Sequence, residues 1–581
     1  MNTISFYSLT PQDMAYIRRN IPCQGACPVL TNIPAYINAI YNGEFDDSYR
    51  INKLANLFPG VLGRICSRPC EEKCRHGEPD LGEPVNICHL KRAAADLSTA
   101  KHVLKKASTS ALAKTICIVG AGPAGLAAAY DLALSGMNVT IFEANEEPGG
   151  MLRYGIPEFR LPRSVLRKEI DQILALGIHV ETGVKVGQHI SLEELRSKFD
   201  SVVIATGCYK ASKLNIPGED MAGVYPGLNF MMDVCSGRPP QVGDKVIVIG
   251  AGFTAFDCAR TALRLGAKEV MICLRRTEAD LTVTKEEILE TKKEGIIIQG
   301  LMVAQAIEQG DGLKYVKFLR TRPTTLRPDG KREVEPIEGS DFTISANTII
   351  VATGQSPDPL TIRANKGRSQ SLSLPTQDSA TPLPGLYLAG DFLTGPSTVI
   401  EAIASGRKVA STVLADLGVD STWNPTVKMQ ETDVTYRERA WDFLPRQNMP
   451  MIESIDIRLS SLNKEVETGF NQEIARTESK RCYLCYLHYE IDLYRCIYCR
   501  LCIDVAPRDC IKMVKAGHVS EEGTLELSEA SKWNEVAGIV IDNERCIRCG
   551  ECMRVCPVKC ISVSRIELVP SYEIREGGDG Q

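Results

Sequence analysis

The sequence lacks the features that mark membrane-spanning, exported and nucleic-acid-binding proteins. None of its apolar runs reaches about 18 residues, the length that a membrane-spanning helix needs, so we expect no membrane span. Its start, MNTISFYSLTPQDMAYIRRN, has no charged segment followed by an apolar core, so we expect no signal peptide. The net charge is -5 with no basic stripe, which argues against nucleic acid as a partner.

The sequence is also poor in side chains for acid–base and hydrolytic catalysis. Its 7 histidines form no metal-ligand pattern, and it shows no Ser-His-Asp set and no substrate-pocket motif. We therefore predict no catalytic side chain. Bound cofactors are expected to carry the chemistry, and another subunit is expected to hold the final substrate.

Cysteine, by contrast, is abundant and clustered. Of the 22 cysteines, six lie near the N-terminus and eleven after position 480, and two Gly-x-Gly loops lie between these groups. This clustering does not fit a disulfide scaffold in a chain of this length. It indicates metal clusters in a reduced cytoplasm.

The first glycine-rich loop follows the apolar strand TICIV and precedes a helix-length apolar segment. Gly120, Gly122 and Gly125 form G-x-G-x-x-G, in which the first glycine allows a tight turn. The second lets the backbone approach a pyrophosphate, and the third lets helix and strand pack closely. Glu143 ends the next strand, where a carboxylate can accept a hydrogen bond from a ribose hydroxyl. The pattern predicts a dinucleotide site.

A second unit of the same kind begins at KVIVI. Gly250, Gly252 and Ala255 give G-x-G-x-x-A, and the following strand ends in Arg275 and Arg276 rather than in an acid. Arginine at this position can accommodate a 2′-phosphate, which favours NADP. Two alternatives stay open: the arginines are solvated, or they contact the nicotinamide pyrophosphate. Strands alternating with helices predict parallel sheets, and therefore an α/β fold with two Rossmann-like domains.

The motifs around these loops resemble those of the small subunit of glutamate synthase and of the flavin part of dihydropyrimidine dehydrogenase. They are EPGGMLRYGIPEFRLP, VVIATG, TIIVATG and GLYLAGDFLTGPSTVIEAIASGR, within a likeness that covers about residues 20–490. The resemblance implies that FAD occupies the first site and NAD(P) the second. It adds the cofactor-binding positions Gly150, Thr206, Gly354, Gly390, Asp391, Thr398 and Val399. By this likeness Asp391 would bind the ribityl chain, and Thr398 and Val399 would lie beside the isoalloxazine ring.

Six N-terminal cysteines supply soft thiolate ligands, which suit iron–sulfur clusters or zinc. The resemblance points to two [4Fe–4S] clusters, but the C-x-x-C pair that precedes Cys23 in relatives is missing. KRCYLCY supplies a pair at that spacing much later. We therefore predict a cluster A ligated by Cys23, Cys74, Cys482 and Cys485, and a cluster B ligated by Cys27, Cys66, Cys70 and Cys88. The alternative is that the four cysteines of cluster A are buried thiols.

Some relatives use a non-cysteine ligand one helical turn after the position of Cys88. That position here is Lys91, whose ammonium group has no lone pair for a metal, so Cys88 is the better candidate.

The C-terminal cysteines form two copies of the bacterial ferredoxin motif C-x₂-C-x₂-C-x₃-C-P, whose fourth cysteine ligates the other cluster. The second copy is complete, whereas the first has Ala506 at its fourth position. Cluster C is predicted to use Cys496, Cys499, Cys502 and Cys556. Cluster D is predicted to use Cys546, Cys549 and Cys552, with Cys510 as its fourth ligand. The alternative is that Cys510 and its counterpart Cys560 are packing positions.

These motifs predict six segments. They are a helical iron–sulfur domain (1–110), the first part of an FAD domain (111–240), an inserted NAD(P) domain (241–384), the second part of the FAD domain (385–420), a connector returning to the N-terminal domain (421–490) and an α+β ferredoxin domain with two clusters (491–581).

The predicted function is that of an electron-transfer subunit with FAD, NAD(P) and three to four [4Fe–4S] clusters. Its partner would be another redox subunit, such as a 2-oxoacid:acceptor oxidoreductase. The alternatives are a free-standing NAD(P)H:ferredoxin oxidoreductase with soluble ferredoxin as partner, a glutamate synthase small subunit, or a cluster-stabilised scaffold without turnover.

Overall fold

The structure, a computed structural model, divides into two units that each combine distant parts of the sequence. Unit 1 contains Met1–Lys105, Thr422–Met449 and Gly469–Gln581, and unit 2 contains Lys106–Ser421 and Pro450–Thr468. The residues described are 14–79, 81–100, 102–104, 114–326, 332–358, 361–364, 368–371, 379–381, 383–421, 425–433, 437–519, 525–569 and 574–576. Within these ranges, no helix is both long and apolar enough to cross a membrane.

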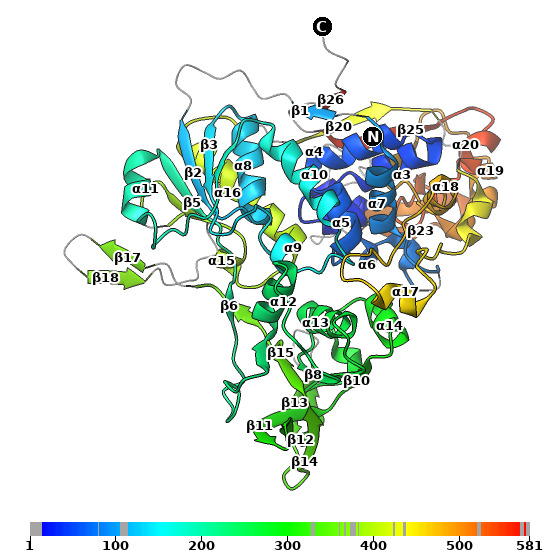
Figure 1. The fold of residues 1–581 in the computed structure, drawn as a ribbon. Coiled ribbons are helices and arrows are strands. Elements are labelled where there is room, and N and C mark those ends of the chain that lie inside the picture. Colours follow the sequence, from blue (N-terminus) through cyan, green and yellow to red (C-terminus); the bar gives the residue numbers. More distant parts are fainter. Residues whose placement is uncertain are drawn as a thin grey trace. The chain divides into compact units, whose positions relative to one another are not determined.

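The first βαβ motif of unit 2 lies at the centre of a five-stranded parallel sheet with the order β19-β5-β2-β3-β4 (Figure 1). The strands are β2 (Thr115–Val119), β3 (Asn138–Phe142), β4 (His179–Glu181), β5 (Ser201–Ile204) and β19 (Leu386–Leu388). TICIV forms β2 because a strand covered by helices on both faces needs a continuous apolar run. β19 joins the sheet far along the chain from β5, so the intervening residues form an insertion.

Helix α8 (Pro123–Leu134) packs against α16 (Val399–Asp416) beside this sheet. Arg407 and Asp131 form a buried ion pair with two N–O distances of 2.9 Å between the two helices. Two parallel hydrogen bonds of this kind fix the relative orientation of the helices. The motif GLYLAGDFLTGPSTVIEAIASGR is thereby held against the first glycine loop.

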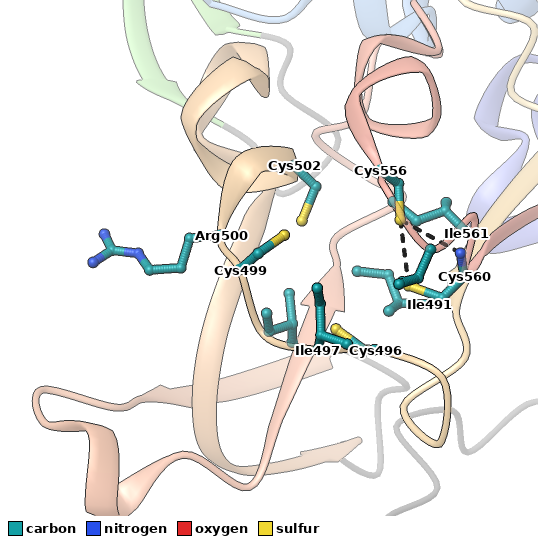
Figure 2. A pocket seen from close by; sticks show the side chains of 11 residues that line it. Ile491, Cys496, Ile497, Cys499, Arg500, Cys502, Cys556, Cys560 and Ile561 are labelled. Carbon is teal, nitrogen blue, oxygen red and sulfur yellow. Dashed lines mark hydrogen bonds between the residues drawn. The ribbon is translucent and has the colours of Figure 1, made fainter.

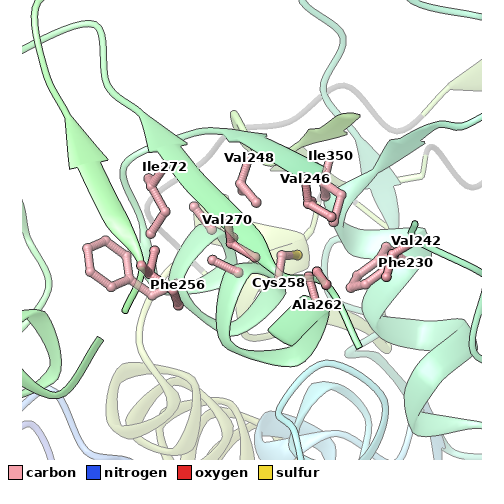
Figure 3. Packing of buried hydrophobic residues seen from close by; sticks show 14 of the residues in the cluster. Phe230, Val242, Val246, Val248, Phe256, Cys258, Ala262, Val270, Ile272 and Ile350 are labelled. Atoms are coloured by element: carbon pink, nitrogen blue, oxygen red, sulfur yellow. The ribbon is translucent and has the colours of Figure 1, made fainter. Parts of the chain in front are cut away.

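The inserted residues form a second five-stranded parallel sheet with the order β10-β9-β8-β15-β7. Its strands are β7 (Val224–Pro226), β8 (Lys245–Ile249), β9 (Glu269–Cys273), β10 (Ile297–Gln299) and β15 (Thr348–Val351). Figure 3 shows how residues of β8, β9 and β15 pack against α12 (Gly227–Cys235) and α13 (Phe253–Arg264), with Phe256 and Cys258 fully buried. This sheet begins at β7, before the predicted start of the NAD(P) domain at 241.

Unit 2 contains further elements besides these two sheets. An antiparallel sheet contains β11 (Met302–Gly310), β12 (Leu313–Leu326), β13 (Arg332–Pro336) and β14 (Phe342–Ala346). Two short antiparallel pairs join β6 (Lys210–Ala211) to β16 (Gln355–Ser356) and β17 (Thr361–Ala364) to β18 (Arg368–Ser371). The other helices are α9 (Met151–Tyr154), α10 (Arg163–Leu174), α11 (Leu192–Lys198), η2 (Glu278–Asp280), α14 (Lys285–Lys293), α15 (Asp391–Thr394) and α17 (Ile455–Leu459).

The N-terminal part of unit 1 is helical, as its sequence predicts. Its helices are α1 (Met14–Asn20), α2 (Pro22–Ala26), α3 (Ile33–Asn42), α4 (Phe45–Ala55), α5 (Pro59–Ile65), α6 (Pro69–Glu72), η1 (Arg75–Gly77) and α7 (Ile87–Leu97). Several are only one turn long and begin with proline, which suits the first helical position because its missing N–H has no intrahelical acceptor. The cysteines lie at the ends of these short helices.

The C-terminal part of unit 1 contains two related halves. One half has α19 (Leu501–Val505) and η4 (Pro507–Asp509) followed by β22 (Ile511–Val519), which pairs with β23 (Leu525–Glu529) and β24 (Gly538–Ile541). The other has α20 (Glu551–Val555) followed by β25 (Ile561–Val569), which pairs with β21 (Leu487–Ile491) and β20 (Thr426–Glu431). The remaining elements are β1 (His102–Leu104), paired with β26 (Ile574–Glu576), and η3 (Arg439–Phe443), α18 (Gln472–Ser479) and η5 (Trp533–Glu535).

Residues 469–485 contact the N-terminal helices within unit 1. Helix α18 packs on α3 and α7, and the buried Glu478 accepts hydrogen bonds of 2.8 Å from the backbone N–H groups of Asn86 and Gln447. Arg481, also buried, donates to the carbonyl oxygens of Glu83 at 2.6 Å and Pro84 at 3.2 Å. These bonds fix the cysteine pair that follows Arg481 against the N-terminal part of the chain.

Candidate functional site

A cavity of about 820 Å³ opens along the carboxyl ends of the first sheet of unit 2. This is the edge where parallel α/β sheets bind ligands. Eight predicted cofactor-binding residues line it: Gly120, Gly122, Glu143, Gly150, Thr206, Asp391, Thr398 and Val399. These residues come from four motifs that are separated in the sequence, and the fold brings them together around one cavity.

The glycine loop is shaped by close backbone approach. A Cβ atom on Gly125 would lie 1.9 Å from the carbonyl oxygen of Gly120, so only glycine lets helix and strand meet here. Gly122, the residue before α8, faces open space, with the Cα of Gly150 3.9 Å from its ideal Cβ position. The N-terminus of α8 therefore opens onto the cavity, and such a terminus attracts phosphate.

Glu143 organises the opposite side of this loop. It is buried and accepts hydrogen bonds from the backbone N–H of Ala121 at 2.8 Å and from the backbone and side chain of Asn145 at 2.9 and 2.8 Å. Asn145 also lines the cavity, and the sequence reasoning missed it because it belongs to no glycine motif. Its place two residues after the strand-ending acid is the signal that could have identified it.

Asp391 begins α15 and lines the cavity. Its Oδ1 accepts a hydrogen bond of 2.6 Å from the Ser397 hydroxyl, and burial raises the pKa of its carboxyl group. Thr398 caps the N-terminus of α16 together with Glu401, so Val399 sits on the first turn facing the cavity. Gly390, with φ of 62°, and Gly354, with φ of 142°, shape the adjacent turns.

FAD fits this cavity by three observations. The volume lies within the range of cofactor sites. A glycine loop and a helix N-terminus offer backbone N–H groups at one end, and carboxylates lie at the predicted ribose and ribityl positions.

The second glycine loop occupies the same place in the second sheet. Gly250 follows β8, and its ideal Cβ would lie 2.3 Å from the carbonyl oxygen of Ala352, the residue after the neighbouring strand β15. Gly252 precedes α13 with open space at its Cβ position, and Ala255 is fully buried in that helix. After β9, Arg276 donates from Nε to the carbonyl oxygen of Arg332 at 2.7 Å, which leaves its other guanidinium nitrogens for a ligand or solvent.

Cys23, Cys74, Cys482 and Cys485 line one cavity of unit 1. Burial raises the pKa of Cys23, and the neighbouring Cys485, Cys74 and Cys482 raise it further. We call these four cysteines group A. The structure thus places residues more than 400 positions apart around one space, as the missing C-x-x-C pair predicts, and their ligation of a cluster remains a prediction.

Group B comprises Cys27, Cys66, Cys70 and Cys88. Hydrogen bonds of Cys88 with Cys66 and with Cys70 shift the pKa values of these three thiols, and burial raises all three. Lys91 is buried beside all four cysteines, and although burial lowers its pKa, the thiolate charges raise it more. The lysine supplies positive charge to this group and, lacking a lone pair, no ligand.

Group C lies in the C-terminal part of unit 1. Cys496, Cys499, Cys502 and Cys556 line one cavity, and Figure 2 shows the first three turned toward a shared space while Arg500 points away. A fifth cysteine, Cys560, also lines this cavity, with its sulfur 3.5 Å from that of Cys556. The sequence interpretation left Cys560 out as the counterpart of Cys510.

Group D comprises Cys546, Cys549 and Cys552 together with Cys510, the predicted fourth ligand. Cys510 lines one cavity with Cys546, Cys549 and Cys552. A hydrogen bond with Cys510 lowers the pKa of the Cys546 thiol, against the effect of burial. Ala506, which replaces the fourth motif cysteine, lines the same cavity without a donor atom. Cys510 is therefore placed to complete a four-thiolate set.

The chemistry of these four groups fits iron–sulfur clusters. Each supplies at least four thiols, all 22 cysteines are free of disulfide bonds, and thiolate is the ligand that such clusters use. Most of the thiols have raised pKa values, to about 11 for Cys74 and Cys502 and about 12 for Cys482, because they are buried. Ligation of a cluster requires the thiolate form, so binding of a cluster would displace these protons. Among the described residues, no three His, Cys, Asp or Glu side chains are arranged to hold one metal ion.

Three family models match successive parts of the chain. Residues 114–406 match pyridine nucleotide-disulphide oxidoreductase, residues 18–103 match dihydropyrimidine dehydrogenase domain II with its 4Fe-4S cluster, and residues 495–560 match a 4Fe-4S dicluster domain. Cys482 and Cys485 fall between the two iron–sulfur matches. The resemblance predicted from the motifs is confirmed.

Curated relatives extend over most of the chain. The NADP(+)-dependent formate dehydrogenase subunit beta of Moorella thermoacetica is 35% identical over 80% of this chain and 70% of its own length. The NADPH-Fe(3+) oxidoreductase subunit beta of Geobacter sulfurreducens is 33% identical over 80% of this chain and 75% of its own. The glutamate synthase [NADPH] small chain of Azospirillum brasilense is 30% identical over 68% and 86%.

The central match covers half of the chain, and both flanking matches are to 4Fe-4S domains. The cofactor set of FAD, NAD(P) and [4Fe–4S] clusters predicted from the sequence agrees with these matches. The chain belongs to the pyridine nucleotide-disulphide oxidoreductase family, as an oxidoreductase with iron–sulfur domains on both sides of its dinucleotide-binding part.

Proposed function

We propose that this protein is the NADP(H)-linked electron-transfer subunit of a larger redox complex. The observation that carries the proposal is the combination within one chain of a two-site dinucleotide unit and four separate groups of cysteines. A protein that only accepts hydride needs no iron–sulfur cluster, and a ferredoxin needs no nucleotide site. A chain with both nucleotide sites and clusters is suited to exchange electrons between two-electron and one-electron carriers.

The residues of unit 2 serve to bind and orient. Gly120, Gly122 and the N-terminus of α8 receive the FAD pyrophosphate, Glu143 a ribose, and Asp391 the ribityl chain. When bound, FAD accepts hydride and releases electrons singly. The second glycine loop and Arg275 and Arg276 hold the nicotinamide nucleotide. Two named relatives use NADP(H), which supports the 2′-phosphate role of these arginines.

Within unit 1, the cysteine groups follow one another in the order B, A, D, C. Groups B and A both draw cysteines from the segments around α2 and α6. Burial raises the pKa of the Tyr36 hydroxyl most, and nearby cysteines of both groups raise it further, so Tyr36 lies close to both. Groups A and D meet where Tyr483, Cys485, Ile547 and Cys549 pack together. Groups D and C exchange their fourth cysteines. Electrons can therefore pass along one series, with group C at its end.

Two of the relatives are named as beta subunits and a third as a small chain, so the expected partner is another subunit rather than a free carrier. A role restricted to that of a glutamate synthase small chain is less well supported, because that relative aligns with only 68% of this chain. The many free thiols support a location in the reducing cytoplasm.

Anaerobic titration with NADPH tests the proposal. We expect bleaching of the flavin absorption band, followed by EPR signals from reduced [4Fe–4S] clusters, in protein containing about four clusters per FAD. NADH should act more weakly. Protein that binds FAD and clusters but shows no NADPH-driven reduction would contradict electron transfer and favour the scaffold alternative. Full activity with soluble ferredoxin, in protein that copurifies with no other chain, would favour the free-standing enzyme.

A further inference from the structure

A buried arginine joins the cysteine segments of groups A and D. Arg437, 1% exposed, donates from Nε to the carbonyl oxygen of Cys482 at 3.1 Å and from Nη1 to that of Ile547 at 3.1 Å. Cys482 belongs to group A, and Ile547 lies directly after Cys546 of group D. One guanidinium group therefore bonds both segments at once.

A second buried arginine occupies the same junction. Arg548, also 1% exposed, donates to the carbonyl oxygens of Leu487 at 3.2 Å and Asn543 at 2.7 Å, and to that of Cys546. Leu487 lies two residues after Cys485 of group A. This arginine, like Arg437, thus contacts backbone next to cysteines of both groups.

Apolar packing and a carboxylate complete the junction. The Arg437 guanidinium lies 4.8 Å from the centroid of the Tyr483 ring, which packs with Ile547 between the two groups. Asp442 accepts from Arg437 at 3.5 Å and from Arg508 at 2.7 Å. In this buried setting, charges act over a lower dielectric than in water, so each one changes the electrostatic potential at both groups.

The internal repeat shows that, of the two motifs, only the one at group D carries a buried arginine. The two motifs read RCIYC and RCIRC, so Tyr498 stands beside group C where Arg548 stands beside group D. The two halves also differ in exposure, because Ile497 is 59% exposed and its counterpart Ile547 only 1%. The motif at group C is therefore open, with its Arg495 and Arg500 exposed to solvent, whereas the motif at group D is covered and holds the buried Arg548.

Resting on the proposed ligand sets, we propose that Arg437 and Arg548 are positioning residues that hold the segments of groups A and D together and raise the reduction potentials of both clusters. Reduction adds one negative charge to a cluster, and a fixed positive charge nearby stabilises the reduced form. Groups A and D then form the more readily reduced middle of the series, between B and C.

Four variants of the full-length holoprotein separate charge from hydrogen bonding. Arg437→Gln and Arg548→Met remove the charges, whereas Arg437→Lys keeps the charge and loses the forked geometry. Asp442→Asn removes the negative charge beside Arg437 and leaves both arginines in place. Arg545→Gln is the matched control, because Arg545 lies in the same motif with its side chain 57% exposed. Iron content, EPR line shapes and EPR-monitored redox titrations are measured for each.

The neutral variants should lower the equilibrium constant for reduction of clusters A and D about tenfold, which is 59 mV for one electron. Asp442→Asn should shift the same two potentials upward. Arg437→Lys should stay near the wild-type potentials, and Arg545→Gln should leave all four unchanged. Neutral variants with full iron content and wild-type potentials would overturn the proposal. If those variants lose clusters, unchanged potentials in Asp442→Asn would overturn it.

These outcomes remain distinct from failure of the proposed function. That failure would already be visible in the wild-type protein, as fewer than four clusters or as absence of reduction by NADPH.

Discussion

The two units differ in how their sites are assembled. In unit 2, each dinucleotide site is built around one local strand–turn–helix motif, and later segments complete it. In unit 1, group A draws on Cys23 and Cys74 at one end of the chain and on Cys482 and Cys485 at the other. One unit therefore depends on local backbone geometry, and the other depends on bringing distant segments together.

This difference has an energetic consequence. Closing a loop of some 400 residues costs conformational entropy, but this cost grows only slowly with loop length. Tertiary contacts between the two segments can therefore offset it. In unit 1 these contacts include the Glu478 and Arg481 bonds to the N-terminal backbone. A cluster at group A would stabilise the same junction, because it binds only when both segments are present. Loss of clusters should therefore loosen unit 1 and leave FAD binding in unit 2 intact.

The largest expected effect separates the two units. Gly122→Val places a side chain in the space before α8, where the approach to pyrophosphate is closest. A clash of about 1–3 kcal/mol or more weakens FAD binding roughly 10–100-fold or more, and the iron content should stay unchanged. Absorption spectra and iron analysis check both. Gly252→Val, the matched change in the second site, should keep FAD and lose reduction by NADPH. Full yellow colour in Gly122→Val would refute the FAD assignment.

The next largest effect concerns the two halves of the ferredoxin repeat, in which Cys510 and Cys560 occupy matched positions. Cys510→Ala removes one thiolate from group D, so this cluster should be lost or damaged and iron should fall by up to about a quarter. Cys560→Ala, at the matched position of the other half, should retain all the iron because Cys556 completes group C. Iron analysis and EPR compare them. Equal losses from both variants would show that Cys560, rather than Cys556, ligates cluster C.

A smaller effect concerns nucleotide choice in unit 2. Replacing both Arg275 and Arg276 with alanine removes charge-assisted hydrogen bonds to a 2′-phosphate, each worth about 1.5–3 kcal/mol. KM for NADPH should rise tenfold or more, with little change for NADH. Steady-state kinetics with both nucleotides measures this. Equal changes for the two would show that these arginines do not contact the 2′-phosphate.

The smallest effect compares two links within unit 1. The Tyr16 hydroxyl lies 2.5 Å from Nδ1 of His488 in a buried position, whereas Arg19 pairs with the exposed Glu544 at 3.2 Å. Tyr16→Phe should lower the free energy of unfolding by about 1–2 kcal/mol, and Arg19→Gln by less than about 1 kcal/mol. Urea unfolding followed by cluster absorbance distinguishes them. A larger loss from Arg19→Gln would contradict this ranking.

Much of unit 2 could be predicted because its chemistry is local. The glycines of TICIVGAGPAG fix a turn whose partners lie within thirty residues, so Gly120 and Glu143 were identifiable directly. Asn145, which hydrogen-bonds Glu143, belongs to no glycine motif, and only its place two residues after that acid could have identified it. β7 precedes the predicted boundary at 241 and still pairs with β15 in the second sheet, and such strand pairing is a tertiary property that no local pattern encodes.

In unit 1 the sequence shows which cysteines and arginines are present, but it does not show which of them lie close together in the fold. Group A was predictable only because one cysteine pair was missing and another was in surplus. The place of Cys560 beside group C depends on the fold and is not visible in the motif. Arg437 and Arg548, at the junction of groups A and D, could not be identified either, because most arginines are exposed and only the structure shows that these two are buried.

The central claim is that both ends of the chain ligate one cluster. Iron per FAD should be measured in Cys74→Ser, in Cys482→Ser and in the double variant, each in the full chain. If both cysteines bind cluster A, each single variant loses the iron and EPR signal of one cluster, and the double variant loses no more than either single one. Loss of two clusters in the double variant would contradict the account, since the two cysteines would then belong to different sites.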